Sequence, residues 1–309
     1  MAVPAQEGAI PGRDRGYWTD AWRQVLSDPM GLLGVGLVGG LILLATFAPI
    51  LAPYDPNYQH SLGLSVNGEP LGPSARFKLG TDPLGRDEFS RLAYGARVSL
   101  IVGLGANAIA AFIGVAIGGI AGMGRGWLHT AMMRLVDVVL SFPVLLLGVA
   151  VLVVTKPDIL TIVLIIGLSF GAYLSRIVFA QVVSLREREF VLAAVTAGTR
   201  SGWILVRHVI PHVLPSVLVF VSLGVATAIQ LEAAFSYVGI GIQPPRASWG
   251  NMINEGQTYL ASAPWLVIFP GVTIMLAMLG FSLLGDSLRD VLDPTLERRA
   301  RLLGFGGVR

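Results

Sequence analysis

The longest run of side chains capable of chemistry lies in residues 185–215, "LREREFVLAAVTAGTRSGWILVRHVIPHVLP", between two strongly apolar segments. His208 and His212 are four residues apart, a spacing that would place two metal ligands on one face of a helix. The glutamate expected beside the first histidine of a metalloprotease helix is Val209, and Pro211 disturbs the helix between the two. Because no third ligand lies nearby in the sequence, we predict no metal site here.

A serine nucleophile is the second chemistry to consider. The segment "GLSFG", residues 167–171, has the G-x-S-x-G pattern of hydrolases that attack through a serine. Such a serine needs a histidine base within hydrogen-bonding reach, and every histidine of this chain lies in a predicted loop or at a membrane edge. We therefore interpret Ser169 as bonded to its own helix between two packing glycines. An intramembrane serine protease stays as a remote alternative.

Two glycine patterns bear on nucleotide binding. "GVGLVG", residues 34–39, fits a dinucleotide-binding pattern, but that pattern needs a preceding strand, and these residues lie inside a long apolar segment. Small residues at such spacing instead allow membrane helices to approach closely, as do Gly114, Gly118 and Gly122. A Walker A loop requires G-K-[S/T], and neither Lys78 nor Lys156 has that context. The chain is therefore predicted to bind no ATP and no other cofactor itself.

The elements that carry these residues are predicted to be membrane helices. Of the 309 residues, 54% are hydrophobic and 13% are charged, whereas soluble proteins are about 25% charged. The net charge of +3, from 22 basic and 19 acidic residues, is too small and scattered to indicate nucleic-acid binding. The absence of cysteine excludes disulfides and thiolate sites.

A bilayer-spanning helix needs about 20 mainly apolar residues, and the chain supplies six such segments. They are residues 30–52, 98–123, 135–154, 159–175, 213–236 and 264–285. The predicted fold class is therefore an all-α polytopic membrane protein with six transmembrane helices.

Arginine and lysine accumulate in cytoplasmic loops, which orients the predicted helices. With the N-terminus inside, fifteen of the 22 basic residues are cytoplasmic and seven lie outside. This places residues 1–29, a tail with a short amphipathic helix at "YWTDAWRQVLSD", and residues 287–309 in the cytoplasm. Residues 53–97 become a long outer loop, residues 98–286 a five-helix core, and the segment at about 184–215 a cytoplasmic loop.

Charged groups inside membrane helices are costly and suggest function, so three positions need an interpretation. Asp137 and Arg176, near the cytoplasmic ends of their helices, are expected to snorkel or to pair. Glu232, near the outer end of the fifth span, is favoured as a packing or pairing group and kept as a candidate gate or pathway residue. Trp249, in "QPPRASWG", is expected to anchor an outer gate at the membrane interface.

The cytoplasmic loop has the features of a docking element. In "EREFVLAAVTAG", four apolar residues recur at helical spacing: Phe190, Ala193, Ala194 and Ala197. Gly198 can end that helix in a left-handed conformation, and "SGWILVRHVIP" then begins a second short helix, which Pro211 and Pro215 separate from the fifth span. Two short helices with a glycine corner would form a rigid projection for a partner. The alternative is an interfacial helix lying on lipid.

This loop resembles the coupling loop of ABC importer permeases, E-A-A-x3-G-x9-I-x-L-P. Ala193, Ala194, Gly198 and Pro211 match it in register, whereas Leu192, His208 and Ile210 depart from it. Those departures are similar to the dipeptide/oligopeptide/nickel branch, as are "LGTDPLGRDEFSRLAYGARVSL", "RLVDVVLSFPVLLL" and "EAAFSYVGIGIQPPRASWGNM". The resemblance covers roughly residues 31–296 in order. The polar leader and the long first outer loop resemble the C-type permease of a heterodimeric pair.

The resemblance implies a type I ABC importer permease in a bacterial or archaeal cell membrane. Its partners would be a homologous permease, two ATPase domains that bind ATP and Mg, an extracytoplasmic substrate-binding protein and membrane lipid. The ATPases would grip the coupling loop, for which we select Glu187, Glu189, Phe190, Ala193, Ala194, Gly198, His208 and Pro211.

Two questions remain open at this stage. Four charged residues of the first outer loop form either a docking surface for the binding protein or a structural salt-bridge network: Asp82, Arg86, Asp87 and Arg91. The substrate is expected to be di- or oligopeptides, because no histidine-rich path lines the spans. Nickel, glycosides and opines are alternatives, and a channel is a remote one.

Overall fold

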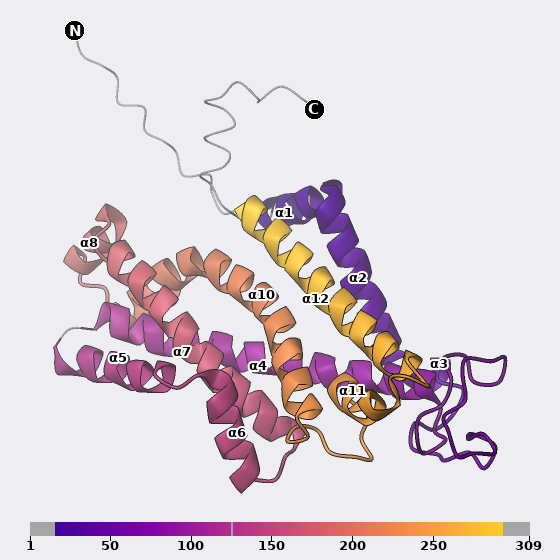
Figure 1. Ribbon diagram of the computed structural model, residues 1–309. Helices are drawn as coiled ribbons and strands as arrows, with labels where there is room; N and C mark the ends of the chain where they lie inside the picture. The colour runs from indigo at the N-terminus through magenta and orange to yellow at the C-terminus, as the bar shows by residue number, and fades with distance from the viewer. Residues whose placement is uncertain (1–15, 125, 293–309) are drawn as a thin grey trace.

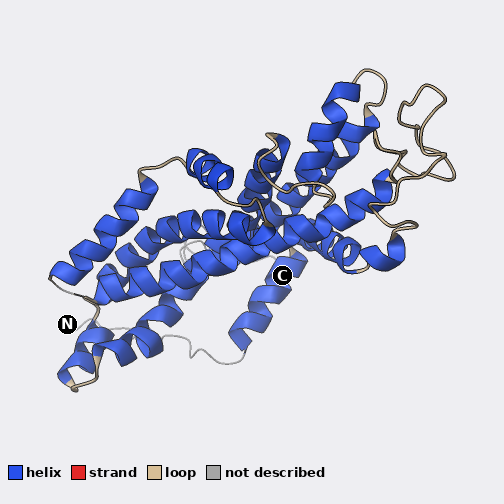
Figure 2. Cartoon of the chain, turned by 90° about the horizontal axis from the view of Figure 1, so that it is seen from below, coloured by secondary structure: helices blue, strands red, loops and turns tan. Residues whose placement is uncertain are grey.

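The computed structural model describes residues 16–124 and 126–292, and the regular structure within these ranges is helical (Figures 1 and 2). The predicted terminal tails lie largely outside the described residues. In chain order the helices are α1 Gly16–Ser27, α2 Pro29–Thr46, α3 Ala48–Leu51, α4 Glu88–Met123, α5 Trp127–Leu140, α6 Val144–Val154, α7 Ile159–Leu185, α8 Glu189–Thr196, α9 Ser201–Ile204, the π-helical turn η1 Leu205–Val209, α10 Ile210–Tyr237, α11 Trp249–Gly256, the 3₁₀ turn η2 Gln257–Tyr259 and α12 Trp265–Leu292.

The membrane-spanning pattern agrees with the prediction, with one broken helix. Five helical segments are long and apolar enough to cross a membrane, and a sixth span results if α5 and α6 are counted together. The predicted third span, residues 135–154, falls on α5 and α6, which meet at an angle of 81°. The break falls at residues 141–143, where Pro143 cannot donate the next helical hydrogen bond and disfavours helix at Phe142.

The prolines after the predicted cytoplasmic loop do not interrupt the helix as predicted. α9, η1 and α10 form one helical run, Ser201–Tyr237, of 37 residues. The wider π-helical turn η1 is inserted just before Pro211. Pro211 then occupies the first turn of α10, where proline is tolerated, and only Pro215 lies inside the helix. The expectation of a separate short helix before the fifth span is therefore wrong.

Glycines hold α4 and α7 together, as their spacing predicted. A Cβ on Gly118 would lie 2.5 Å from the carbonyl oxygen of Ser175, and Gly114 and Gly122 likewise meet Leu174 and Val182. Gly167 and Gly171 of α7 approach α4 in return. Between them, the Ser169 hydroxyl donates to the Ile165 carbonyl oxygen at 2.9 Å, which supports a packing role for "GLSFG".

We expect Gly118→Ala to destabilise the folded chain by about 1–3 kcal/mol, because the added methyl group meets backbone that cannot move alone. Gly105→Ala is the matched control on the same helix, since its Cβ would meet Val163 at an ordinary 3.4 Å. Thermal unfolding of the purified complex in detergent measures both. Equal midpoints for the two variants would contradict this account of the α4–α7 contact.

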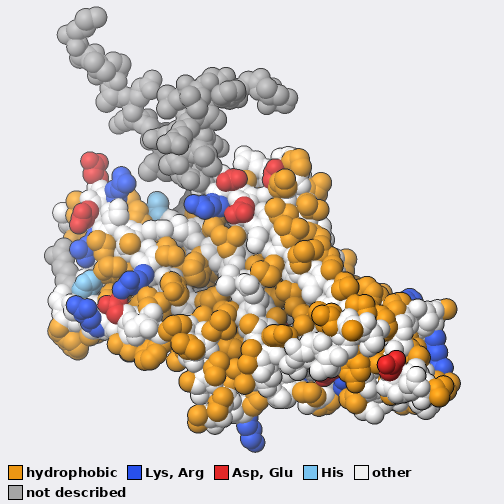
Figure 3. All heavy atoms as spheres, viewed as in Figure 1, with side chains coloured by type: hydrophobic (Ala, Val, Ile, Leu, Met, Phe, Trp, Pro, Cys, Tyr) orange, Lys and Arg blue, Asp and Glu red, His pale blue; other side chains and the backbone are white. Residues whose placement is uncertain are grey.

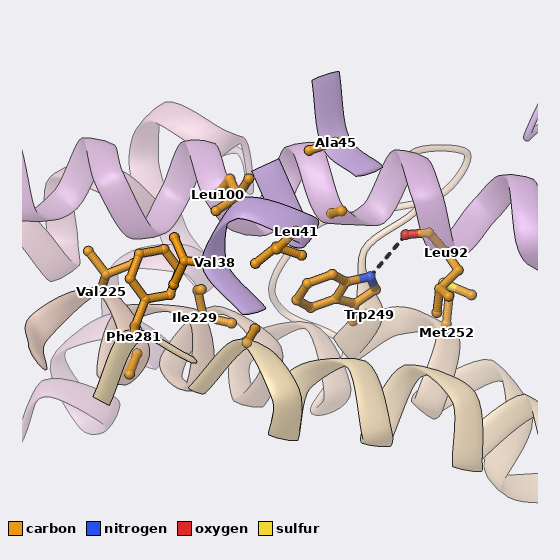
Figure 4. Packing of buried hydrophobic residues seen from close by; sticks show 13 residues of the cluster. Val38, Leu41, Ala45, Leu92, Leu100, Val225, Ile229, Trp249, Met252 and Phe281 are labelled. Carbon is orange, nitrogen blue, oxygen red and sulfur yellow. Dashed lines mark hydrogen bonds between the residues drawn. The ribbon is translucent and has the colours of Figure 1, made fainter. Parts of the chain in front are cut away.

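A second core joins α2, α4, α10, α11 and α12. Figure 4 shows its side chains, with Trp249 of α11 inserted between α4 and α12. Gly34 of α2 lets that helix approach the backbone of α12 at Leu284. A Cβ built on Gly36 or Gly39 would meet no atom of the described residues within 4 Å. Only part of "GVGLVG" therefore packs closely within this chain.

The two ends of the molecule differ in character. α8 lies at one end and the large loop, residues 52–87, at the other (Figure 1). Figure 3 shows charged side chains gathered towards the ends and apolar surface between them. α1 is helical as predicted and adjoins α2 through Asp28, whose carboxylate accepts from the Gly31 N–H (2.9 Å) and the Ser287 hydroxyl (3.0 Å). These hydrogen bonds lower the pKa of Asp28.

Candidate functional site

The loop that contains α8 is tied to the bundle at its base. α7 ends at Leu185, and the Arg186 guanidinium donates to the carbonyl oxygens of Gly122 (3.1 Å) and Gly124 (3.5 Å). These carbonyls belong to the C-terminal end of α4, where unpaired carbonyl groups and the helix dipole favour a cation. The entry into the loop is thereby fixed to the most buried helix pair of the fold.

A glycine corner ends α8 as the sequence predicted. Gly198 has a φ of +80°, its N–H donates to Val195 O at 3.0 Å, and the Thr199 N–H donates to Ala194 O at 3.1 Å. These two bonds form a Schellman motif, which requires the left-handed conformation that glycine adopts without strain. No atom lies within 4 Å of a Cβ built at Gly198. Backbone conformation, not space, therefore demands glycine at this corner.

α8 turns only part of its predicted apolar face towards the bundle. Val191 is buried, and with the half-buried Ala194 it packs against α9, η1 and α10. Phe190, Ala193 and Ala197 are exposed, so of the predicted apolar face only Ala194 points inward. Val191 was missed because the six consecutive residues 190–195 of "EFVLAAVT" are all apolar, so the sequence does not distinguish one face. Since Leu192 and Val195 are each 52% exposed, an apolar surface is left uncovered.

The two histidines of the loop connect α8 to α10. The His212 ring stacks on Phe190 at a centroid distance of 5.2 Å, and its Nδ1 lies 2.6 Å from the carbonyl oxygen of His208. Within residues 16–124 and 126–292 no group of three metal-ligating side chains is close enough to hold a metal ion. His212 thus takes part in packing and local hydrogen bonding.

At the opposite end, the charged residues of the outer loop form a buried ion-pair cluster. Arg86 and Arg91 both pair with Asp82, and the Arg91 Nε lies 3.3 Å from its carboxylate. Both guanidinium groups also reach the Glu255 carboxylate, at 2.8 and 2.9 Å. The side chains of Asp82, Arg86 and Arg91 are at most 3% exposed. This geometry favours the structural alternative over a docking surface.

Glu255, the fourth member of the cluster, was not selected from the sequence. It lies on α11, 164 residues after Arg91, and no local pattern links the two. Asp87 was selected, but its carboxylate accepts from the N–H and the hydroxyl of Ser90 (2.8 and 2.7 Å). It therefore caps α4 at its N-terminus.

The residues selected as a candidate gate are both fully buried. The Glu232 carboxylate accepts from the hydroxyls of Ser99 (3.2 Å) and Ser236 (2.9 Å), which joins α10 to α4. The Trp249 indole N–H donates to Leu92 O at 3.0 Å, and its ring fills the space beside Gly95 (Figure 4). The expectation that Trp249 is an interfacial anchor is wrong. An indole that is completely buried in the second core has no contact with lipid.

Of the two alternatives given for Asp137 and Arg176, snorkelling or pairing, the structure shows an ion pair. Arg176 of α7 forms an ion pair with Asp137 of α5, and Arg134 lies 3.6 Å from the same carboxylate. The pair also connects the broken third span to the central helix α7. Its partial exposure leaves it accessible from the surface of this chain.

A helical bundle of five or six candidate membrane spans, with an apolar-faced projection at one end and an ion-paired loop at the other, is the architecture of a multi-pass membrane protein. The chain belongs to the family described as binding-protein-dependent transport system inner membrane component, whose model matches residues 114–298. The N-terminal TM domain of oligopeptide transport permease C matches residues 16–68. The protein is thus the inner-membrane permease component of an ABC transporter, not its ATPase.

Characterised relatives match along nearly the whole chain. The dipeptide transport system permease protein DppC of Alkalihalophilus pseudofirmus is 37% identical, over 91% of this chain and 90% of its own. The oligopeptide transport system permease protein OppC of Bacillus subtilis is also 37% identical, over 94% and 93%. The glutathione transport system permease protein GsiD of an Escherichia coli strain is 36% identical, over 96% of both chains.

Proposed function

We propose that this chain is the C-type permease of an ATP-driven peptide importer and forms half of its translocation pathway. It pairs with a homologous permease, and α8 faces the cytoplasm together with both chain termini. Two ATPase subunits that bind ATP and Mg dock from that side, and a substrate-binding protein docks from the other. The family supports ATPase and binding-protein partners, and the likeness to permease C supports a homologous permease as the third kind of partner.

The observation that carries the coupling role is the uncovered apolar face of α8. Leu192 and Val195 are half exposed at the tip of a projection whose other side is held by Val191. An exposed apolar patch on a rigid support marks a protein contact. Glu187 and Glu189 flank this face and have no ion-pair partner among the described residues. Their carboxylates are therefore available to basic groups of an ATPase.

The helical run after the corner gives coupling a mechanical basis. Only residues 197–200, with the corner at Gly198, lie between α8 and the run Ser201–Tyr237. Because that run is continuous, a displacement of α8 that passes the corner is carried into α10 without a further loop. The stacked Phe190 and His212 rings hold α8 against the start of that run. ATP-driven closure of the ATPases would move α8, α10 would follow, and the cavity between the two permeases would open outward. Such switching requires each ligand to favour one state.

The outer ion-pair cluster positions the outer loop and is not itself a docking surface. Asp82, Arg86 and Arg91 are too deeply buried to meet a binding protein. We therefore assign the docking of the binding protein to the exposed residues of the same loop, which the cluster holds against α4 and α11. Glu232 and Trp249 act in the same way, as buried supports of the outer end.

Peptides are the proposed substrate class. The relatives named above transport dipeptides, oligopeptides and glutathione, and all three carry peptide bonds. Nickel, glycosides and opines are the alternatives. Binding proteins loaded with each of these ligands distinguish them from peptides, because the ATPase activity of the complex is expected to respond to the loaded form.

We expect the reconstituted complex to hydrolyse ATP faster when its binding protein is loaded with di- or oligopeptides. ATPase activity in proteoliposomes measures this, with the unloaded binding protein as control. Stimulation only by a nickel- or glycoside-loaded protein would retain the permease and overturn the peptide assignment. A complex whose ATPase activity ignores every loaded binding protein would contradict the coupling proposal.

A further inference from the structure

A cleft between α7 and α10, about 340 Å³ in volume, lies at mid-membrane depth on the surface of this chain. It is lined by Phe170 and Tyr173 of α7 and by Phe220, Leu223, Gly224 and Thr227 of α10. Tyr173 is close to the midpoint of Ile159–Leu185, and Thr227 is well inside Ile210–Tyr237. No charged side chain contributes to the lining.

An uncharged polar stripe extends the cleft along α10. Thr227 and Gln230 are exposed, and their three-residue spacing places them on one face of the helix. Tyr237 continues that face at the outer end, where its hydroxyl donates to Gln257 Oε1 at 3.1 Å. Within the described part of the chain, neither the Tyr173 hydroxyl nor the Gln230 amide has a recorded hydrogen-bond partner.

Other exposed helix faces at this depth are apolar. On α12 the exposed large side chains are Ile268, Val272, Met275, Leu276 and Leu279, and on α4 they include Ile101, Leu104 and Phe112. Those faces suit lipid. A tyrosine that is 56% exposed at mid-span, next to exposed threonine and glutamine, does not, because polar groups in spans face protein or water. Tyrosines that contact lipid concentrate instead at the membrane interface.

A further neutral polar group stands directly behind the wall of the cleft. Asn107 of α4 is fully buried and its Oδ1 has no hydrogen-bond partner. A Cβ on Gly224 would lie 2.1 Å from that oxygen, so glycine alone lets α10 pass this close. The hydrogen-bonding groups of the cleft and its wall are thus uncharged: they belong to Tyr173, Thr227 and, behind Gly224, Asn107.

We infer that Tyr173, Thr227 and Gln230 line the translocation pathway and hydrogen-bond the backbone of the passing peptide. This inference rests on the proposed function. A peptide leaving water needs partners for its backbone N–H and C=O groups, and hydroxyl and amide side chains can both donate and accept. Because the stripe carries no charge, it recognises the backbone that all peptides share and does not discriminate among their side chains.

The cysteine-free sequence allows a direct test of exposure to water. Gln230→Cys in the full reconstituted complex is expected to react with a membrane-impermeant maleimide about tenfold or more faster than Met275→Cys, because a thiol in lipid does not ionise. The label is read on this chain after the subunits are separated. Equal, slow labelling at both positions would place Gln230 against lipid or protein and overturn the inference.

Charge at Gln230 tests contact with substrate. Relative transport of otherwise identical acidic and basic tripeptides is expected to shift about threefold to tenfold in opposite directions in Gln230→Glu and Gln230→Lys. Gln230→Met, which keeps the volume and removes the amide, should slow all peptides about threefold to tenfold. Thr273→Val, the removal of a hydroxyl on α12 that already donates to Phe269 O, is the control and should change nothing.

ATP hydrolysis stimulated by the loaded binding protein distinguishes failure of the pathway assignment from failure of the proposed function. It is expected to persist in the Gln230 variants, since they leave α8 untouched. Persistent hydrolysis with unchanged selectivity in both charged variants overturns the pathway assignment alone. Absent stimulation in the unsubstituted complex overturns the proposed function and this assignment with it.

Discussion

Gly198→Val is expected to weaken coupling severely while the complex still assembles in the membrane. A β-branched residue at a φ of +80° costs about 1–2 kcal/mol or more, which lowers the population of the native corner roughly 5- to 30-fold. The Schellman bonds from Gly198 and Thr199 are then lost, and α8 no longer presents Leu192 and Val195 in one orientation. Transport and binding-protein-stimulated ATPase activity should fall by a similar factor.

Two variants of the same loop separate conformation from side-chain size. Gly198→Asn should retain most of the coupling, because asparagine enters the left-handed region more easily than other residues. Gly202→Ala should be neutral, since this glycine of α9 also has open space around it but no positive φ. Normal transport by Gly198→Val, or equal losses in all three variants, would refute the corner as the coupling element.

Helix positions and the glycine corner could be predicted because they depend on local sequence. Apolar length identified the spans, and Gly114, Gly118 and Gly122 indicated the α4–α7 contact through their spacing alone. Gly198, which follows a helical segment, indicated a residue in the left-handed conformation. Each inference requires only neighbours within a few turns of the chain.

Features that depend on residues far apart could not be predicted in the same way. Glu255 joins Arg86 and Arg91 across more than 160 positions, and nothing in its own segment indicates an ion pair. The burial of Trp249 depends on the space above Gly95, and the inward face of α8 depends on α9 and η1. The effect of the prolines was wrongly predicted because a π-helical turn, which has no simple sequence signature, precedes Pro211, and the helix continues through it.

One helix, α10, connects the loop that carries α8 to the proposed pathway. α10 begins at the loop that carries α8, exposes Thr227 and Gln230 at mid-depth, and ends beside α11. Its outer half is held to α4 by the Glu232–Ser99 hydrogen bond. A movement that begins at α8 therefore reaches the substrate path and the outer end through one continuous element.

Arg91→Leu is expected to cause the largest loss of stability, about 3–5 kcal/mol, because two carboxylates of a buried cluster then share the single counter-charge of Arg86. Arg91 is 1% exposed and meets both Asp82 and Glu255. Arg97→Leu, two turns later on α4, is the control. Arg97 is exposed and forms no ion pair with another residue in 16–124 or 126–292, so its loss should stay within about 0.5 kcal/mol. Thermal inactivation of ATPase activity in the purified complex measures both.

A compensating substitution distinguishes charge balance from simple loss of packing. In Arg91→Leu combined with Glu255→Leu, one cation and one anion are removed and the Asp82–Arg86 pair remains. The loss of stability in the double variant should therefore be smaller than the sum of the losses in the two single variants, by about 0.5–3 kcal/mol of coupling energy. If the two losses simply add, the cluster contributes through packing and not through its charges. The outer loop would then owe its position to the N-terminal cap at Asp87 and to the burial of Phe77.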